Sequence, residues 1–257
     1  MKKTAVAIGI ALAAFSMIGC AQKKTILVQS IDDLAGKTIG CQAGTTGEAY
    51  IQENIPDATI RSFKNGIDAA LDLKGGGIDA IILDELPAKA IVAANPGLTI
   101  VDAQFAVEDY AIAVRKGDAA LLASINNTIQ RMRSDGSYEA LVNAFMPIDG
   151  NITVPETIPT EGDTVVRMGT NAAFPPFEYV ENAGPIGFDI TMSQMIARDY
   201  GRQLEVVDMN FDGLIAALQS GAIDFIASGM TANDERRQNV DFSEPYYSSN
   251  QVIIVRK

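Results

Sequence analysis

One segment of the chain combines hydroxyl groups, backbone amides and two arginines in a short space. Ser228, Gly229 and Thr231 follow an apolar, strand-like run, and Arg236 comes about one helical turn later. A guanidinium offers two parallel donors to a carboxylate, and the start of a helical turn adds amide groups and the positive end of a dipole. The segment therefore predicts a carboxylate site. Its residues are equally compatible with Arg236 and Arg237 as an exposed pair on a polar helix.

A second polar group follows another apolar run, Lys37–Cys41. Gly44, Thr45 and Thr46 present N–H groups and hydroxyls at a strand-to-helix turn, which suits an anion. The Gly-Lys-Ser/Thr ending of a P-loop is absent, so the turn does not indicate a nucleotide. Asp84, at the end of a further apolar run, is an acceptor for a cation. Donors for a carboxylate and an acceptor for an ammonium group are the chemical outline of a zwitterionic α-amino acid.

Two phenylalanines are placed to flank such a ligand. Phe174 lies in a loop that Pro175 and Pro176 stiffen, and Phe211 begins an amphipathic segment. Loop aromatics beside a polar site can sandwich a ligand side chain. A place in the hydrophobic core is the alternative for each of them.

Apolar runs alternate with amphipathic segments along the chain. The predicted strands are Lys37–Cys41, Ala80–Leu83, Ala111–Val114, Val165–Gly169, Asp224–Ala227 and Val252–Val255. The predicted helices are Gly47–Glu53, Gly66–Lys74, Ala119–Arg133, Ser137–Phe145, Phe188–Tyr200 and Phe211–Gln219. This alternation indicates an α/β protein with parallel sheets covered by helices. Residues 147–163, PIDGNITVPETIPTEGD, show no period and predict a solvated linker.

The chain also contains an internal repeat. Residues 66–84 read GIDAALDLKGGGIDAIILD, and residues 211–229 read FDGLIAALQSGAIDFIASG. Each copy predicts a helix, a glycine-containing turn and a strand, which ends at Asp84 in the first copy and at Ser228 and Gly229 in the second. Ligands bind beyond the carboxyl ends of strands in open parallel sheets, so the repeat predicts two lobes with facing sites. Generic α/β packing is the alternative explanation.

The composition excludes several classes of protein. The 257 residues are enough for two lobes, and a formal net charge of −12 disfavours binding to nucleic acid. The chain has no histidine, which removes His-based catalytic triads and the usual zinc ligands. We therefore expect neither a metal site nor a cofactor.

The first residues indicate export. A short basic region, Lys2 and Lys3, precedes an apolar stretch, Ala5–Gly19, that is too short to span a bilayer. The glycine before Cys20 resembles the end of a bacterial lipoprotein signal, which implies a lipid anchor on Cys20. An ordinary secretion signal is the alternative. Cys41, in an apolar run, is predicted to be a buried free thiol.

Several motifs occur together in this chain. They are GTNAAFPPFEYV, GFDI, FDGLIAALQSGAIDFIASGMT, DFSEPYY, SIDDLAGKTIGCQAGTTGEAY, IDAIILDE and YAIAVRKGD. In combination they resemble the polar amino-acid-binding proteins of bacterial ABC importers, members of the type II periplasmic binding proteins. The resemblance covers nearly everything outside residues 1–30 and the linker. It implies two α/β lobes, each a mostly parallel sheet with flanking helices, and a ligand cleft between them.

The resemblance also implies roles for individual residues. Arg236 would bind the carboxylate of the ligand, and Asp84 its ammonium group. The residues implied to assist these two anchors are Thr231, Thr46, Gly229 and Ser228. The implied turn and aromatic clamp are Gly44, Thr45, Phe174 and Phe211. Asn171 stands where several relatives have an aspartate that contacts the ligand side chain, which weakens the case for a strongly cationic ligand; Glu178 and Arg61 are further candidates for such a contact.

The order of the two parts departs from that of the family. Relatives begin with the segment that resembles 164–256 and continue into the one that resembles 30–148, whereas here the second comes first. This difference implies a circular permutation, which is tolerated where termini lie close together at the surface. The expected parts are a signal peptide at 1–19, a tether at 20–29, a smaller lobe at 30–110, a larger lobe at 111–148 and 164–250, and a joining linker at 149–163. A single covalent crossing is expected near Tyr110–Arg115, with the C-terminal strand at 251–257 pairing beside it.

The resemblance implies an exported, lipid-anchored and monomeric receptor, in the periplasm or at the cell surface. It would bind one free amino acid by hinge closure and deliver it to a separate ABC permease. A receptor that reports to a chemoreceptor or a kinase is an alternative. A dehydratase or lytic transglycosylase on the same fold is a third possibility, against which the intact Arg236 and Asp84 anchors and the lack of histidine argue. The sequence leaves the identity of the amino acid open.

Overall fold

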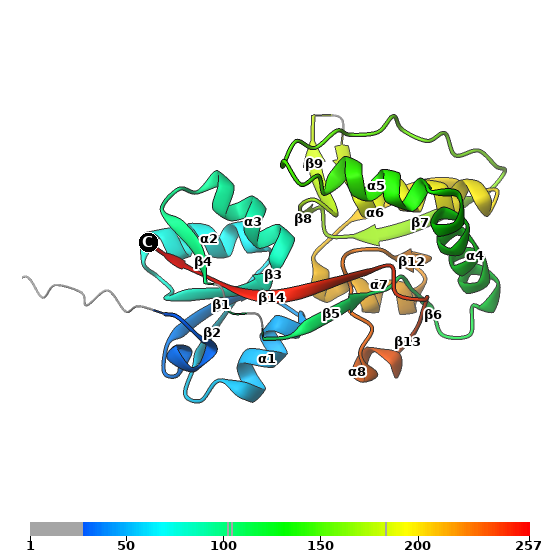
Figure 1. Cartoon of the computed structure of the whole chain (residues 1–257). Helices are drawn as coiled ribbons and strands as arrows, with labels where there is room; N and C mark the ends of the chain where they lie inside the picture. The colour runs from blue at the N-terminus through cyan, green and yellow to red at the C-terminus, as the bar shows by residue number, and fades with distance from the viewer. Residues whose placement is uncertain (1–27, 102, 104, 183) are drawn as a thin grey trace, which may run out of the picture.

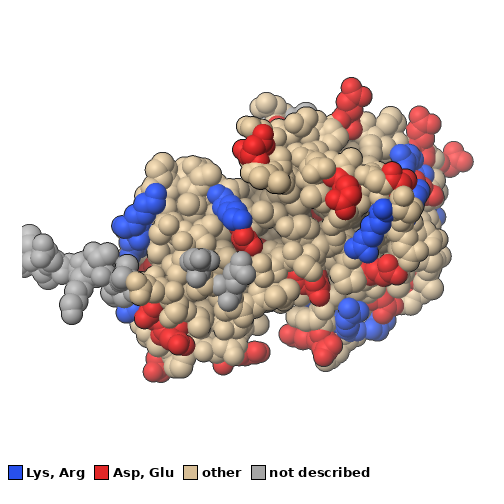
Figure 2. Space-filling view, viewed as in Figure 1, with Lys and Arg blue, Asp and Glu red and all other residues tan. Residues whose placement is uncertain are grey.

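The computed structural model describes residues 28–101, 103, 105–182 and 184–257. Figure 1 shows two lobes side by side, each a β-sheet with helices packed on it, and a long strand that reaches from one lobe to the other. On the face shown in Figure 2, charged side chains are scattered over both lobes, and the surface is notched where the lobes meet. No helix in the described part of the chain is long and apolar enough to cross a bilayer. The predicted signal peptide and Cys20 lie outside the described residues.

The first lobe contains a sheet in the order β2–β1–β3–β14–β4, and β5 pairs with β14. Its strands are β1 (Thr38–Gln42), β2 (Thr59–Phe63), β3 (Ala80–Asp84), β4 (Leu98–Val101), β5 (Val107–Tyr110) and β14 (Tyr247–Arg256). Its helices are the 3-10 turn η1 (Ile31–Leu34), α1 (Thr46–Asn54), α2 (Gly66–Gly75) and α3 (Glu85–Ala94). All residues of the central strand β3 are buried, as expected for a strand covered on both faces. Cys41 is buried and free, as predicted, and burial raises the pKa of its thiol to about 12.

The second lobe contains a sheet in the order β11–β7–β12–β6–β13 and a small sheet in the order β10–β9–β8. The strands are β6 (Ala113–Arg115), β7 (Val165–Thr170), β8 (Ala173–Phe174), β9 (Glu178–Glu181), β10 (Gly184–Ile186), β11 (Gln203–Asp208), β12 (Phe225–Ile226) and β13 (Val240–Phe242). The helices are α4 (Ala119–Asp135), α5 (Ser137–Phe145), α6 (Phe188–Asp199), the 3-10 turn η2 (Phe211–Gly213), α7 (Leu214–Ser220) and α8 (Asp234–Arg237). Each predicted helix is present, although residues 211–219 divide into η2 and α7.

Both main sheets are mixed, which corrects the prediction of mostly parallel sheets. In the first lobe β1 runs parallel to β2 and β3, whereas β14 is antiparallel to β3, β4 and β5. In the second lobe β7 runs parallel to β11 and β12, whereas β6 is antiparallel to β12 and β13. The antiparallel members β6 and β14 enter their sheets from the other lobe. No crossover helix precedes them to impose a parallel direction.

The chain passes between the lobes twice. It leaves the first lobe between β5 and β6 and returns between β13 and β14. Residues Tyr247–Asn250 pair with β5, and residues Gln251–Arg256 pair with β3 and β4. The expectation of a single covalent crossing is therefore wrong, because the C-terminal strand carries the second crossing itself. Two antiparallel strands lie side by side where the lobes join (Figure 1).

The internal repeat is confirmed as a structural repeat. Helix α2 ends at Gly76 and α7 ends at Gly221, with φ angles of 78° and 79°. A left-handed residue of this kind closes a helix at low cost only when it has no Cβ atom. The two turns lead into β3 and β12, so the strand exits at Asp84 and Gly229 come from equivalent positions of the two lobes.

The linker is irregular, as predicted, and it follows the surface of the second lobe. The amide of Thr153 donates to the carbonyl of Ala144 over 2.9 Å. The amide of Ile158 donates to the side chain of Gln194 on α6 over 3.1 Å. These contacts attach the linker to α5 and α6.

Candidate functional site

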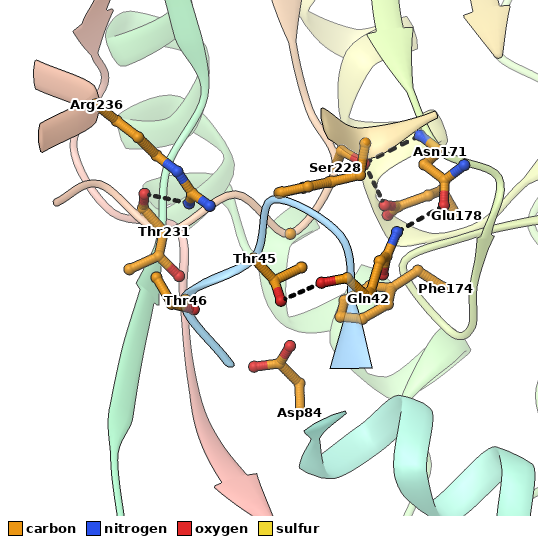
Figure 3. Close-up of a pocket in the computed structure, with 12 residues that line it drawn as sticks. Gln42, Thr45, Thr46, Asp84, Asn171, Phe174, Glu178, Ser228, Thr231 and Arg236 are labelled. Atoms are coloured by element: carbon orange, nitrogen blue, oxygen red, sulfur yellow. Dashed lines mark hydrogen bonds between the residues drawn. The ribbon is translucent and has the colours of Figure 1, made fainter. Parts of the chain in front are cut away.

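A pocket lies between the lobes, at the carboxyl ends of strands from both sheets (Figure 3). The space between its lining atoms, open solvent included, is about 330 Å³. The first lobe contributes Gln42, Thr45, Thr46 and Asp84, and the second lobe contributes Asn171, Phe174, Glu178, Phe211, Ser228, Gly229, Thr231 and Arg236. The strand exits of the internal repeat therefore meet in one cavity. Within the described residues, no cluster of three or more His, Cys, Asp or Glu side chains is arranged to hold a metal ion.

Every ligand-binding residue predicted from the sequence lines this pocket except Gly44. Gly44 lies at its edge, where its carbonyl oxygen accepts a hydrogen bond from Arg236. Arg61 does not line the pocket, because it pairs with Asp72 at 2.7 Å on the outer side of β2. Gln42 and Glu178 belong to the pocket as well. The sequence suggests Glu178 as a contact for the ligand side chain without locating it, and it does not single out Gln42.

Arg236 is held at one end of the pocket. Asn233 caps the short helix α8 by accepting from the amide of Arg236, which orients the arginine. The Nη1 atom donates to the carbonyl of Thr231 and Nη2 to that of Gly44, each over 2.9 Å. The guanidinium lies 5.4 Å from the ring centre of Phe211. Arg236 is only 8 % exposed, so the alternative of an exposed arginine pair is wrong for this residue, whereas Arg237 is exposed.

Asp84 supplies the opposite charge from the first lobe. It is the last residue of β3, and its backbone caps α3. Its carboxylate accepts from the side-chain amide of Gln251 over 3.1 Å. Burial, with the nearby carboxylate of Glu108, raises its pKa to about 7, although Arg236 acts in the opposite direction. Such a group gains from a cation brought beside it.

The turn before α1 is built as the sequence predicted. Thr45 caps the helix, because its hydroxyl oxygen accepts from the amide of Glu48, and the same hydroxyl donates to the carbonyl of Gln42 over 2.7 Å. Thr46 is the first residue of the helix. The positive end of the helix dipole thus faces the pocket beside Arg236.

The two phenylalanines are both pocket walls and nearly buried residues. Phe174 is 7 % exposed and Phe211 8 % exposed, and both line the cavity. Gly229 adopts a φ of 51°, and a Cβ atom there would come within 2.7 Å of the Phe174 ring. The glycine therefore allows the ring to close over the strand exit.

A chain of hydrogen bonds ties the two lobes together at the pocket. Gln42 donates to Asn171 Oδ1 over 2.9 Å, and Asn171 Nδ2 donates to the carbonyl of Met209 over 2.8 Å. The hydroxyl of Ser228 accepts from the amide of Asn171 over 3.0 Å and donates to Glu178 Oε1 over 2.8 Å. Gln42 is the last residue of β1, two residues before Gly44, and this place at a strand exit is the sequence signal by which it could have been found.

The C-terminal part of the chain matches a known family. Residues 166–257 match the sequence profile of the bacterial extracellular solute-binding proteins, family 3. The chain is 44 % identical over 96 residues to the arginine-binding extracellular protein ArtP of Bacillus subtilis, which covers 37 % of this chain and 38 % of that protein. It is 38 % identical over 120 residues to a probable histidine-binding protein of Campylobacter jejuni, covering 46 % and 47 % of the two chains.

Two further proteins are similar in sequence to part of this chain. The L-cystine-binding protein TcyJ of Escherichia coli is 32 % identical over 123 residues, 48 % of this chain and 46 % of that protein. The solved structure of domain 1 of TmArgBP with arginine bound is 42 % identical, covers 36 % of this chain and 80 % of that chain, and has a TM-score of 0.32. The chain thus aligns with less than half the length of these curated relatives. The part of the chain that matches the bacterial extracellular solute-binding proteins, family 3, is therefore residues 166–257.

Proposed function

We propose that the whole chain is an extracytoplasmic solute-binding protein that holds one free amino acid between its lobes and delivers it to an ABC permease. The observation that carries the proposal is the pair Arg236 and Asp84, a buried cation and a buried carboxyl group that line one pocket from different lobes. An α-amino acid carries the complementary charges on two groups that are bonded to the same carbon atom. The named relatives bind arginine, histidine or cystine, which supports a polar or cationic amino acid.

The proposed mechanism is hinge closure. The ligand carboxylate binds Arg236 and the hydroxyl-rich turn of the second lobe, and the ring of Phe174 or Phe211 packs on its side chain. Asp84 and the start of α1 then approach from the first lobe. A ligand that contacts both lobes adds to the stability of the closed form, so occupancy shifts the population towards the shape that a permease would recognise.

A thermal-shift screen tests this function. The purified chain is melted with each of the twenty amino acids, cystine and ornithine. A tight ligand raises the melting temperature by mass action, by an amount that grows with ligand concentration. At least one amino acid should produce such a shift, and the absence of any response across the panel contradicts the proposal.

The lipid anchor is part of the same proposal. Lipidation of Cys20 would tether the soluble lobes to a membrane. The chain expressed in bacteria should partition into the detergent phase of Triton X-114, whereas a Cys20→Ser variant should be found in the aqueous phase. Equal partitioning of the two forms would leave an ordinary secretion signal as the explanation.

The permutation is also proposed rather than observed. It is supported by the family match, which is confined to 166–257, and by the exposed linker that joins α5 to β7. We propose that 149–163 joins the ends that relatives leave free. A rearranged chain, with 164–257 placed before 28–148 through a short glycine-rich junction, should fold and bind the same amino acid. A rearranged chain that is soluble but binds no amino acid would contradict the proposed circular permutation.

A further inference from the structure

Two acidic side chains lie next to each other beneath the pocket. Glu178 begins β9 and Asp189 lies in the first turn of α6, and both are 0 % exposed. Glu178 lines the pocket, whereas Asp189 does not. Two ionised carboxylates that are buried next to each other without a cation between them repel each other strongly. One of the two groups is therefore expected to carry a proton.

The hydrogen bonds of the pair are asymmetric. Glu178 Oε1 accepts from the hydroxyl of Ser228 over 2.8 Å. Asp189 Oδ2 accepts from the amide of Gly229 over 3.0 Å and from the hydroxyl of Tyr246 over 2.7 Å. The other two oxygens, Glu178 Oε2 and Asp189 Oδ1, are buried without a hydrogen-bond partner among the described residues. A proton on Glu178 that is donated to Asp189 satisfies both oxygens at once.

Burial and the neighbouring charges favour a proton on Glu178. Burial, and then the neighbouring carboxylate of Asp189, raise the pKa of Glu178 well above its usual range. Burial raises the pKa of Asp189 to about 6, against the hydrogen bonds that it accepts. The other titratable groups that act on the pair are Asp208 at the end of β11, Tyr246 after β13 and Tyr138 on α5. These groups supply no positive charge, so the pair titrates as a unit that keeps one proton near neutral pH.

The pair is connected to the ligand site on two sides. Ser228 and Gly229, which bond to Glu178 and Asp189, are themselves pocket walls. Glu178 provides an acidic group for the ligand side chain at the place where Asn171 provides only a neutral amide. A cation that reaches Glu178 stabilises the ionised carboxylate. The pKa of Glu178 then falls, and the proton leaves.

We propose that Glu178 and Asp189 share one proton in the empty pocket and release it when the cationic side chain of an arginine-like amino acid reaches Glu178. The released proton passes to the buffer, and the positive charge of the ligand replaces it, so the charge of the pocket is conserved. Asp189 is thereby a positioning residue that sets the protonation of Glu178 without touching the ligand. This inference rests on the amino-acid-binding function proposed above and names the ligand class of that site.

Calorimetric titration of the full chain tests the exchange. L-Arginine and its neutral analogue L-citrulline are titrated in phosphate and in Tris, whose ionisation enthalpies differ, between pH 6 and pH 8.5. Both ligands bring the same ammonium group to Asp84, so any proton released there cancels in the comparison. Arginine should release close to one proton more than citrulline at neutral pH. Its dissociation constant relative to that of citrulline should fall by up to about tenfold per pH unit below the apparent pKa of the pair.

Two variants locate the exchange. Asp189→Asn keeps an oxygen for the amide of Gly229 and the hydroxyl of Tyr246 but removes the second carboxylate. Burial still raises the pKa of Glu178 in this variant, so the extra proton release should decrease at neutral pH and move to lower pH while arginine still binds. Glu178→Gln should bring the affinities for arginine and citrulline to within severalfold of each other. Glu205→Gln, an exposed position on β11, is the matched control and should behave as the parent chain.

The outcomes separate this inference from the proposed function. Equal proton release by arginine and citrulline overturns the inference and leaves the function standing. Failure of arginine to bind, with binding of other amino acids, does the same. Failure of every amino acid contradicts the proposed function itself. If Asp189→Asn does not fold, the comparison of arginine with citrulline on the parent chain still tests whether arginine releases the additional proton.

Discussion

The guanidinium of Arg236 donates a hydrogen bond from Nη2 to the carbonyl oxygen of Gly44 over 2.9 Å, from one lobe to the other. A second bond between the lobes joins Gln42 to Asn171, and a third joins the hydroxyl of Thr231 to Glu108. The proposed carboxylate anchor therefore also links the two lobes directly. A ligand carboxylate would compete with the Gly44 carbonyl for the same donors, so binding and closure act through one side chain.

Arg236→Lys should weaken amino-acid binding by about 100-fold or more, because lysine cannot offer two parallel donors and leaves polar groups of a buried site unpaired. Calorimetry with the amino acid found in the thermal screen measures the loss. Arg237→Lys, one residue later and exposed, should bind as the parent chain does. Equal effects of the two substitutions would remove Arg236 from the site.

Asp84→Asn should stabilise the ligand-free protein at pH 8 and abolish binding. The pKa of Asp84 is raised from 3.8 to about 7, so its contribution to stability is full below about pH 4 and is lost as the pH rises to about 7. The asparagine variant escapes this loss, which is on the order of 2–4 kcal/mol in free energy of unfolding at pH 8. Chemical denaturation at pH 4 and pH 8 gives the two differences. A variant that is less stable than the parent at pH 8 would show that Asp84 is ionised without strain.

Gln42→Ala should loosen closure. The side chain donates both to Asn171 across the pocket and to the carbonyl of Lys64. Loss of such bonds costs ~1 kcal/mol, so ligand affinity should fall about fivefold. Small-angle scattering should report a larger radius of gyration for the ligand-free variant. Gln219→Ala, whose amide bonds only within the second lobe to Asn239, should change neither quantity.

The C-terminal strand should be required for the first lobe to fold. Ile253 is fully buried between Ile82 of β3 and Val101 of β4. Ile253→Ala should lower the free energy of unfolding by ~2–5 kcal/mol, whereas the fully exposed Ile148→Ala should have no measurable effect. Removal of 251–257 should unfold the lobe and abolish binding. Unchanged melting and affinity after that deletion would contradict the role of β14.

The sequence was most informative at the strand exits. The internal repeat places Asp84 and Gly229 at equivalent positions, and the structure brings both to the pocket. Gln42 and Glu178 were harder to place, because their positions depend on contacts between lobes and on the hairpin β8–β9–β10. The sequence marks the strand exit at which Gln42 lies, but it does not show the contacts that bring Gln42 and Glu178 to the pocket.

The sequence did not predict helix α3 or the polar half of β14, and each omission has a physical reason. Helix α3 starts directly at Asp84, with no intervening turn residues to mark the boundary. Only the apolar half of β14 was predicted, because Tyr247–Asn250 is a polar segment that pairs with β5 between the lobes. The strand directions in the sheets follow from which lobe the chain has just left, and periodicity carries no information on that.

The central claim is that Arg236 and Asp84 hold the carboxylate and the ammonium group of one amino acid, and calorimetry with truncated ligands tests it most directly. L-Arginine is compared with agmatine, which lacks the carboxylate, and with 5-guanidinopentanoic acid, which lacks the ammonium group. Both analogues should bind at least about 100-fold more weakly than arginine, because each leaves one buried charge unpaired. Binding of either analogue with the affinity of arginine would contradict the account.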